Sequence, residues 1–96
     1  MIKFPAVLTH AQAAGFFRTA GQEVLAQPKE LVVDATGLQQ FDSSALAVLL
    51  DCRRQALAAG KTFAVLGMPQ RLLQLAGVYG VAELLPATAG NAVPAL

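Results

Sequence analysis

Residues 30–60 read ELVVDATGLQQFDSSALAVLLDCRRQALAAG, and this stretch decides the fold. It opens with the apolar run Leu31-Val32-Val33, whose β-branched residues are typical of a buried strand. After a turn, the polar run Asp42-Ser43-Ser44 precedes a periodic apolar segment, which is the signal of a helix N-cap. Gly60 is expected to end this helix in the left-handed conformation. The stretch predicts a strand, a loop and a helix, and we expect the functional site at the start of the helix.

The predicted central helix has an apolar face wider than one face of a sheet normally covers. Leu46, Leu50 and Leu57 form one edge of it, and we expect this edge to be available to a partner or to a second copy. Arg53 interrupts the leucines, so it is a candidate partner contact as well as an ordinary solvated residue. The stripe expected to pack on the sheet comprises Ala45, Val48, Leu49, Cys52 and Ala56.

Upstream of this stretch, residues 2–8 predict a first strand, which Pro5 restricts to a sheet edge or to a later start. Thr9 and Gln12 have the spacing of a capping box and predict the start of a helix. The apolar face expected for this helix comprises Ala13, Phe17, Ala20 and Val24, widened by Phe16 and Leu25.

Downstream, residues 61–67 predict a strand, and Met68-Pro69 opens a further helix. Residues 81–85 predict a short strand or a last helical turn, and residues 87–96 a flexible tail. Alternating strands and helices predict a sheet with parallel neighbours. The inner face expected for the last helix comprises Leu72, Leu73, Ala76 and Tyr79.

The composition restricts the class of protein. The 96 residues are enough for one domain, and because 55% are hydrophobic and 14% charged, we expect a packed core with some apolar surface covered by a partner. A formal charge of +1, no basic run and no Trp speak against nucleic-acid binding. No apolar run approaches the roughly 20 residues of a membrane span, and the N-terminus does not resemble a secretory signal. We expect an intact cytosolic chain that does not insert into a membrane.

Three side chains have simpler interpretations than catalysis. Asp34 is expected to accept hydrogen bonds from amides in the turn after its strand. Cys52 is expected to be a small buried residue, not a reactive thiol, and His10 an exposed residue near a helix start. Because no residue would orient a nucleophile and no glycine-rich phosphate loop is present, we expect no catalytic residue, no metal and no cofactor.

Residues 32–86, VVDATGLQQFDSSALAVLLDCRRQALAAGKTFAVLGMPQRLLQLAGVYGVAELLP, resemble a STAS domain, the fold of bacterial anti-sigma-factor antagonists. In that family an Asp ends a buried strand and Asp-Ser/Thr-x-Gly-Leu opens a helix, and here Asp34 and residues 42–44 hold these places. The resemblance implies a small α/β sandwich over residues 1–86, with a mixed sheet, parallel neighbours and about three helices. Ala45 stands where the family usually has Gly, which counts against a phosphorylation switch.

Two groups within the family compete for the function. Residues 45–50 and 82–86 resemble MlaB-like subunits, the small cytoplasmic STAS subunits of phospholipid-transporting ABC systems. In that group the hydroxyl directly after the loop Asp is functional, which corresponds to Ser43, and the helix packs on the ATPase subunit. In anti-sigma-factor antagonists the phosphorylated serine comes one position later, which corresponds to Ser44, and the partner is a serine kinase.

The first group is the preferred interpretation. It implies a non-catalytic subunit, cytoplasmic and peripheral to the inner membrane through a transporter, that binds the ATPase. The alternative is an antagonist regulated by phosphorylation of Ser44, and a small-ligand or nucleotide module at the helix N-terminus stays open. The residues predicted to bind the partner are Asp42, Ser43, Ser44, Leu46, Leu50 and Arg53.

Overall fold

The main sheet is parallel and has the strand of the central stretch in its middle. The computed structural model describes residues 2–86, so the tail predicted at 87–96 lies outside the described residues. Strand β3 (Glu30–Asp34) pairs with β1 (Ile2–Lys3) on one side and with β5 (Thr62–Leu66) on the other. Every strand pair in the described part of the chain is parallel, as alternating strands and helices predict, so these residues do not form the mixed sheet that the resemblance implies.

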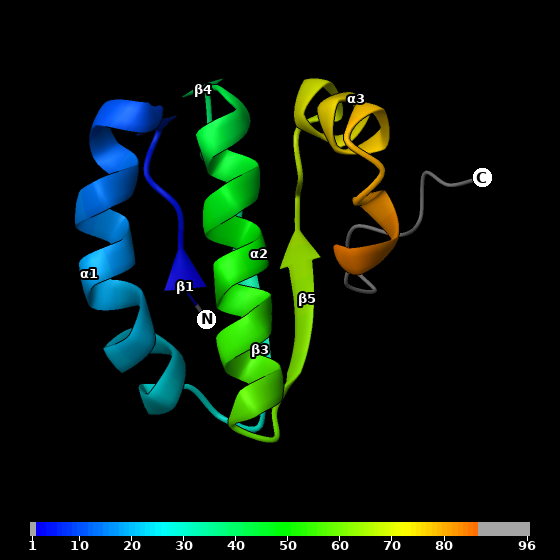
Figure 1. Cartoon of the computed structure of the whole chain (residues 1–96). Coiled ribbons are helices and arrows are strands. Elements are labelled where there is room, and N and C mark those ends of the chain that lie inside the picture. The colour runs from blue at the N-terminus through cyan, green and yellow to red at the C-terminus, as the bar shows by residue number, and fades with distance from the viewer. Residues whose placement is uncertain (1, 87–96) are drawn as a thin grey trace.

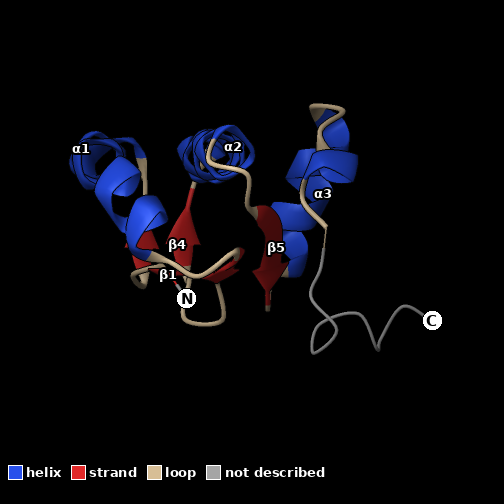
Figure 2. Cartoon of the chain, turned by 90° about the horizontal axis from the view of Figure 1, so that it is seen from below, coloured by secondary structure: helices blue, strands red, loops and turns tan. Residues whose placement is uncertain are grey.

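The helices cover one face of this sheet. Helices α1 (His10–Ala26) and α2 (Ser43–Ala58) lie side by side above the strands (Figure 2). Helix α3 (Gln70–Val78) lies beyond β5, at the end of the sheet where β5 finishes (Figure 1). The predicted small α/β fold with three α-helices is confirmed.

Buried and partly buried side chains alternate along the strands, which explains why helices cover only one face of the sheet. In β3, Leu31 and Val33 are buried, whereas Val32 is only partly buried. Strand β5 repeats the pattern, and Leu31 lies opposite Phe63 in the register. The predicted stripe of α2 is confirmed, because all five of its residues are fully buried. The largest fully buried side chains are Leu8, Leu31, Leu49 and Leu72.

The first strand predicted over residues 2–8 is not continuous, although its first part lies at the edge of the main sheet, as Pro5 indicates. The chain forms two short strands instead, β1 and β2 (Val7–Leu8), and β2 pairs with β4 (Gln40–Phe41) in a separate ladder. Pro5 lies between them and has no amide hydrogen for a ladder. Strand β4 lies in what the sequence predicts to be a loop, and only its pairing with β2 makes it a strand.

Helix α1 begins as predicted but exposes two of its predicted face residues. The capping box of Thr9 and Gln12 is confirmed. Phe17 and Leu25, however, are 39% and 70% exposed, so only part of the predicted apolar face is buried. Helix α1 is an outer helix with α2 on one side only, and its apolar arc is wider than the surface that covers it.

Helix α3 shows the same discrepancy. Leu72 and Ala76 are buried as predicted, but Leu73 and Tyr79 are 47% and 58% exposed. After α3, residues 81–85 form a last turn, the 3₁₀-helix η1 (Ala82–Leu84), and not a strand. The chain then returns to the outer edge of β5, where the Val65 amide donates to the Pro86 carbonyl (2.8 Å). Within residues 2–86 no helix is both long and apolar enough to cross a membrane.

Candidate docking surface

Asp42 links the first turns of two helices. It is the N-cap of α2, in an extended conformation, and its Oδ1 accepts from the Ser44 amide (2.8 Å). Its Oδ2 accepts from the amide of His10, the first residue of α1 (3.1 Å). Both amides belong to the unpaired donors of a helix start. One carboxylate therefore fixes α1 and α2 relative to each other at this end of the molecule.

These hydrogen bonds also set the charge of the site. The amides of Ser44 and His10 lower the pKa of Asp42 below its ordinary value, because they stabilise the ionised carboxylate. The carboxylate, already ionised at neutral pH, keeps its charge to lower pH than usual and stands directly before Ser43. Any phosphate placed on Ser43 or Ser44 would face this negative charge.

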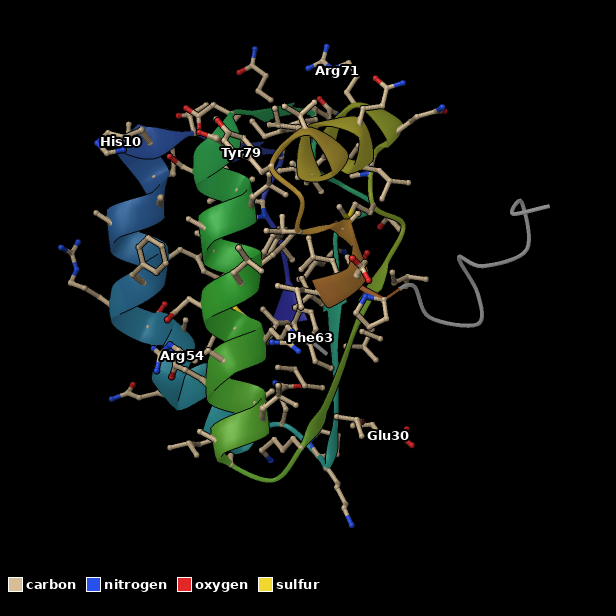
Figure 3. The ribbon with its side chains drawn as sticks, turned by 45° about the vertical axis from the view of Figure 1, so that its right-hand side comes forward. His10, Glu30, Arg54, Phe63, Arg71 and Tyr79 are labelled. Carbon is tan, nitrogen blue, oxygen red and sulfur yellow. The ribbon has the colours of Figure 1, made fainter. Side chains whose placement is uncertain are left out.

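An apolar groove begins at Ser43 and runs between α2 and the end of α3. The groove has a volume of about 310 Å³. Among the α2 residues that line it, Ser43 is the polar one. Figure 3 shows Tyr79 beside the first turns of α2, on the side away from α1. The lining residues are Ser43, Leu46, Ala47, Leu50, Tyr79 and Val81.

The groove contains part of the predicted site and omits the rest. Ser43, Leu46 and Leu50 line it, although Leu46 is otherwise buried. Ser44 does not line it, and its amide is engaged by Asp42. Arg53 lies one helical turn further along α2, half-buried and outside the lining.

Two residues that line the groove were not predicted to belong to the site. Tyr79 has the spacing of an inner-face residue of α3, and Val81 belongs to a short segment without periodicity. Both reach α2 only because the chain folds back after β5. The one sequence feature that could have indicated this part of the groove is an aromatic residue just before Gly80, at the end of a short amphipathic helix.

The position of α3 is supported by a cation–π contact. The guanidinium of Arg71, in the first turn of α3, lies over the ring of Phe41, with its Cζ 5.2 Å from the ring centroid. Phe41 belongs to β4, directly before Asp42. The contact connects α3 to the strand that leads into α2, and so helps to hold the two sides of the groove together.

The remaining predictions for single residues are confirmed. Asp34 accepts from the Thr36 amide (2.9 Å) and from its hydroxyl (2.6 Å), which together lower the pKa of Asp34. Cys52 is fully buried, and loss of solvation raises the pKa of Cys52 to about 12, with smaller contributions from nearby carboxylates. His10 is exposed at the start of α1. None of the three belongs to the groove.

Comparison with known proteins identifies one family. The family model described as "Mlab, STAS domain" matches residues 6–86, which include the whole groove and both helix starts. No curated protein matches the chain.

Proposed function

Because this chain belongs to the STAS domain family of the MlaB type, we propose that it is a regulatory subunit that docks onto the ATPase of a phospholipid-transporting ABC transporter. The observation that carries the proposal is the apolar groove between α2 and α3, next to the Ser43 hydroxyl. A protein interface needs such a desolvated pocket for the anchor side chain of its partner.

The surroundings of the groove support a protein partner. Val78 and Tyr79 are well exposed beside it, and Leu73 and Leu84 add further apolar surface on the same part of the chain. Only 14% of the residues are charged, and several large apolar side chains are in contact with water. Both properties are typical of a subunit that assembles with a partner. Aromatic residues such as Tyr79 are enriched among residues that dominate interface energies.

The two serines differ in their suitability for this role. Ser43 is exposed and lines the groove, so its hydroxyl can reach a docked partner. Ser44 is partly buried, with its amide hydrogen-bonded to Asp42. This difference favours Ser43 as the polar contact, and with it the transporter role over an antagonist that is phosphorylated at Ser44.

Affinity purification of the tagged protein from its native cells, followed by mass spectrometry, tests the proposal. We expect to recover an ABC-type ATPase together with its membrane subunits. Recovery of a soluble serine kinase, with a phosphate on Ser44, would instead support the antagonist role and refute the proposal.

Binding measurements with the purified ATPase then test the groove. Tyr79→Ala should weaken binding by about 30-fold, the effect of losing roughly 2 kcal/mol at a central anchor. Ser43→Ala should weaken it less, because one hydroxyl contact contributes about 1 kcal/mol. Leu57→Ala is the matched control, since Leu57 is exposed on α2 but does not line the groove. Equal affinity of all three variants and wild type would show that the partner docks elsewhere.

A further inference from the structure

A second groove lies on the opposite side of α2, between α2 and α1. Its volume is about 620 Å³, twice that of the groove beside Ser43. Nothing in the proposed docking at α2 and α3 uses it, because the two grooves share no residue. The lining residues are Phe17, Arg18, Gly21, Gln22, Val24, Leu25, Arg54, Gln55, Ala58 and Ala59.

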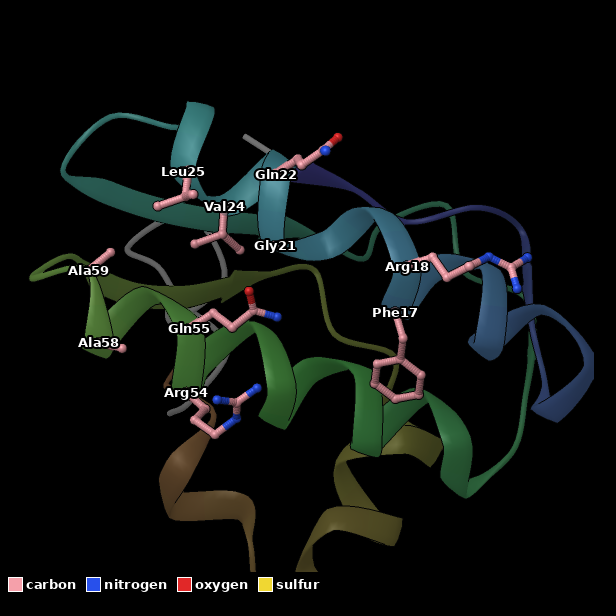
Figure 4. Close-up of a pocket in the computed structure, with 10 residues that line it drawn as sticks. All are labelled: Phe17, Arg18, Gly21, Gln22, Val24, Leu25, Arg54, Gln55, Ala58 and Ala59. Atoms are coloured by element: carbon pink, nitrogen blue, oxygen red, sulfur yellow. The ribbon is translucent and has the colours of Figure 1, made fainter.

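The groove has an apolar end, and its two arginines lie toward the middle and the other end. Figure 4 shows Val24, Leu25, Ala58 and Ala59 at one end and Arg18 at the other, with Arg54 between them. At the middle the Gln55 side chain of α2 lies against Gly21 of α1, since a Cβ on Gly21 would lie 2.8 Å from Gln55 Oε1. The absence of a side chain at Gly21 therefore leaves room for the Gln55 carboxamide between the two helices (Figure 4).

The charge of the lining is positive. It includes two guanidinium groups and two carboxamides and no carboxylate. Arg54 is paired with Asp51 (2.7 Å), which also accepts from Gln55 (2.8 Å). Arg18 has no ion pair within residues 2–86. Glu23 and Asp51 are the only acidic residues of α1 and α2, and neither lines the groove.

From this charge and shape we infer that the α1–α2 groove binds an acidic, apolar peptide segment of a partner protein. The groove extends from Phe17 to Leu25, about 12 Å along α1, which is the length of two helical turns. Two helices lying side by side present the surface on which a third amphipathic helix packs. A carboxylate on that segment would meet Arg18 in bidentate geometry, and a second would bind Arg54 beside Asp51.

The exposure of the walls decides between a peptide and a small ligand. Small-molecule sites bury about 70–90% of their ligand. Here Phe17 and Leu25, which form the walls, are themselves exposed to solvent, so the groove cannot enclose a ligand of that kind. A peptide brings its own apolar side chains to cover both residues.

A random 16-residue peptide display library, selected on the immobilised domain, tests the inference. Counter-selection uses Ala58→Glu, which adds a carboxylate to the exposed end of the groove. We expect enriched peptides to combine leucine or phenylalanine with flanking aspartate or glutamate. Enrichment of basic or neutral peptides, or of none, would overturn the inference.

The best peptide is then measured against purified variants by fluorescence anisotropy. Arg18→Gln and Arg54→Gln should each weaken binding by about 10-fold, the effect of one charge-assisted contact. Ala58→Glu should weaken it more than the isosteric Ala58→Gln does. Lys29→Gln removes one positive charge outside the groove and should leave the affinity unchanged.

Two further results would refute this assignment while leaving the proposed function intact. If Tyr79→Ala abolishes peptide binding and Ala58→Glu does not, the peptide occupies the α2–α3 groove. If dodecanoate below its micellar concentration displaces the peptide and shifts the amide resonances of Gly21 and Ala59 as strongly as the peptide does, the groove is a site for anionic amphiphiles. Retention of peptide binding in the presence of dodecanoate supports the inference.

Discussion

Replacing Gly67 by Ala should destabilise the domain far more than the same replacement at Gly60. Both glycines follow a regular element in the left-handed conformation, with φ of +68° and +75°. A side chain in that conformation costs about 1–2 kcal/mol at either position. The surroundings differ, because a Cβ on Gly60 would meet no atom within 4 Å, whereas one on Gly67 would lie 2.1 Å from Thr36 Cγ2.

Thr36 cannot easily move away from this methyl group. Its hydroxyl donates to Asp34 Oδ1 (2.6 Å), which fixes the side chain, and its Cα would be only 3.2 Å from the new Cβ. Forcing an extra carbon against a side chain and backbone that are held in place costs about 1–3 kcal/mol in a packed core, and this partly exposed site is expected to lie within that range. We therefore expect losses in the free energy of unfolding of about 1–2 kcal/mol for Gly60→Ala and about 2–5 kcal/mol for Gly67→Ala.

Urea unfolding followed by far-ultraviolet circular dichroism measures both losses. With a slope of about 1–3 kcal/mol per molar for a small domain, the two midpoints should differ by roughly 1 M. Thr36→Ser keeps the hydroxyl bond to Asp34 and removes Cγ2, so it should recover part of the Gly67→Ala loss in a double-mutant cycle. Equal midpoints for the two alanine variants, or no coupling with Thr36→Ser, would refute the reasoning.

Three other predictions concern the core, the thiol and the capping carboxylate. Leu49→Ala, at a fully buried position, should lower the free energy of unfolding by about 2–5 kcal/mol, whereas Leu57→Ala should change it by less than about 0.5 kcal/mol in urea titrations. Cys52 should not react with Ellman's reagent at pH 8 until urea unfolds the chain, and rapid labelling of the native protein would contradict its burial. Asp42→Asn keeps an acceptor for α2 and loses the charged contact to α1, so its melting temperature should be below that of wild type at pH 7. The folded-state pKa of Asp42 is lowered, so the difference in melting temperature should have its largest value above about pH 5. It should disappear as the pH falls through the folded pKa. A difference that does not change with pH would exclude the mechanism.

The accuracy of the sequence-based predictions follows the range of the interactions involved. The capping box at Thr9, a cap within residues 42–44 and the turn at Asp34 were predictable, because a side chain bonds an amide two or three residues away, whereas the structure decides that Asp42 and not a serine is the cap of α2. The second role of Asp42, its bond to the His10 amide, was not predictable, because the two residues are far apart in the chain.

Burial was predicted well for α2 and poorly for the outer helices. Helix α2 packs against α1, β5 and α3, so the stripe of Ala45, Val48, Leu49, Cys52 and Ala56 is fully covered. Phe17 and Leu25 on α1, and Leu73 and Tyr79 on α3, have the same helical spacing as buried residues, yet no element covers them within residues 2–86. Periodicity shows that residues share a face, but only neighbouring elements determine whether that face meets protein or water.

The sequence by itself determined the two long strands, the three α-helices in their order and the family, because β-branched runs, apolar periodicity and N-cap side chains act over a few residues. Tertiary structure alone decided the two grooves that flank α2. Ser43 and Tyr79 line one groove, and Gln55 lies against Gly21 in the other, only after parallel strand pairing has brought the helices together. Both surfaces proposed to bind partners depend on packing between segments that are distant in the chain, which no local pattern encodes.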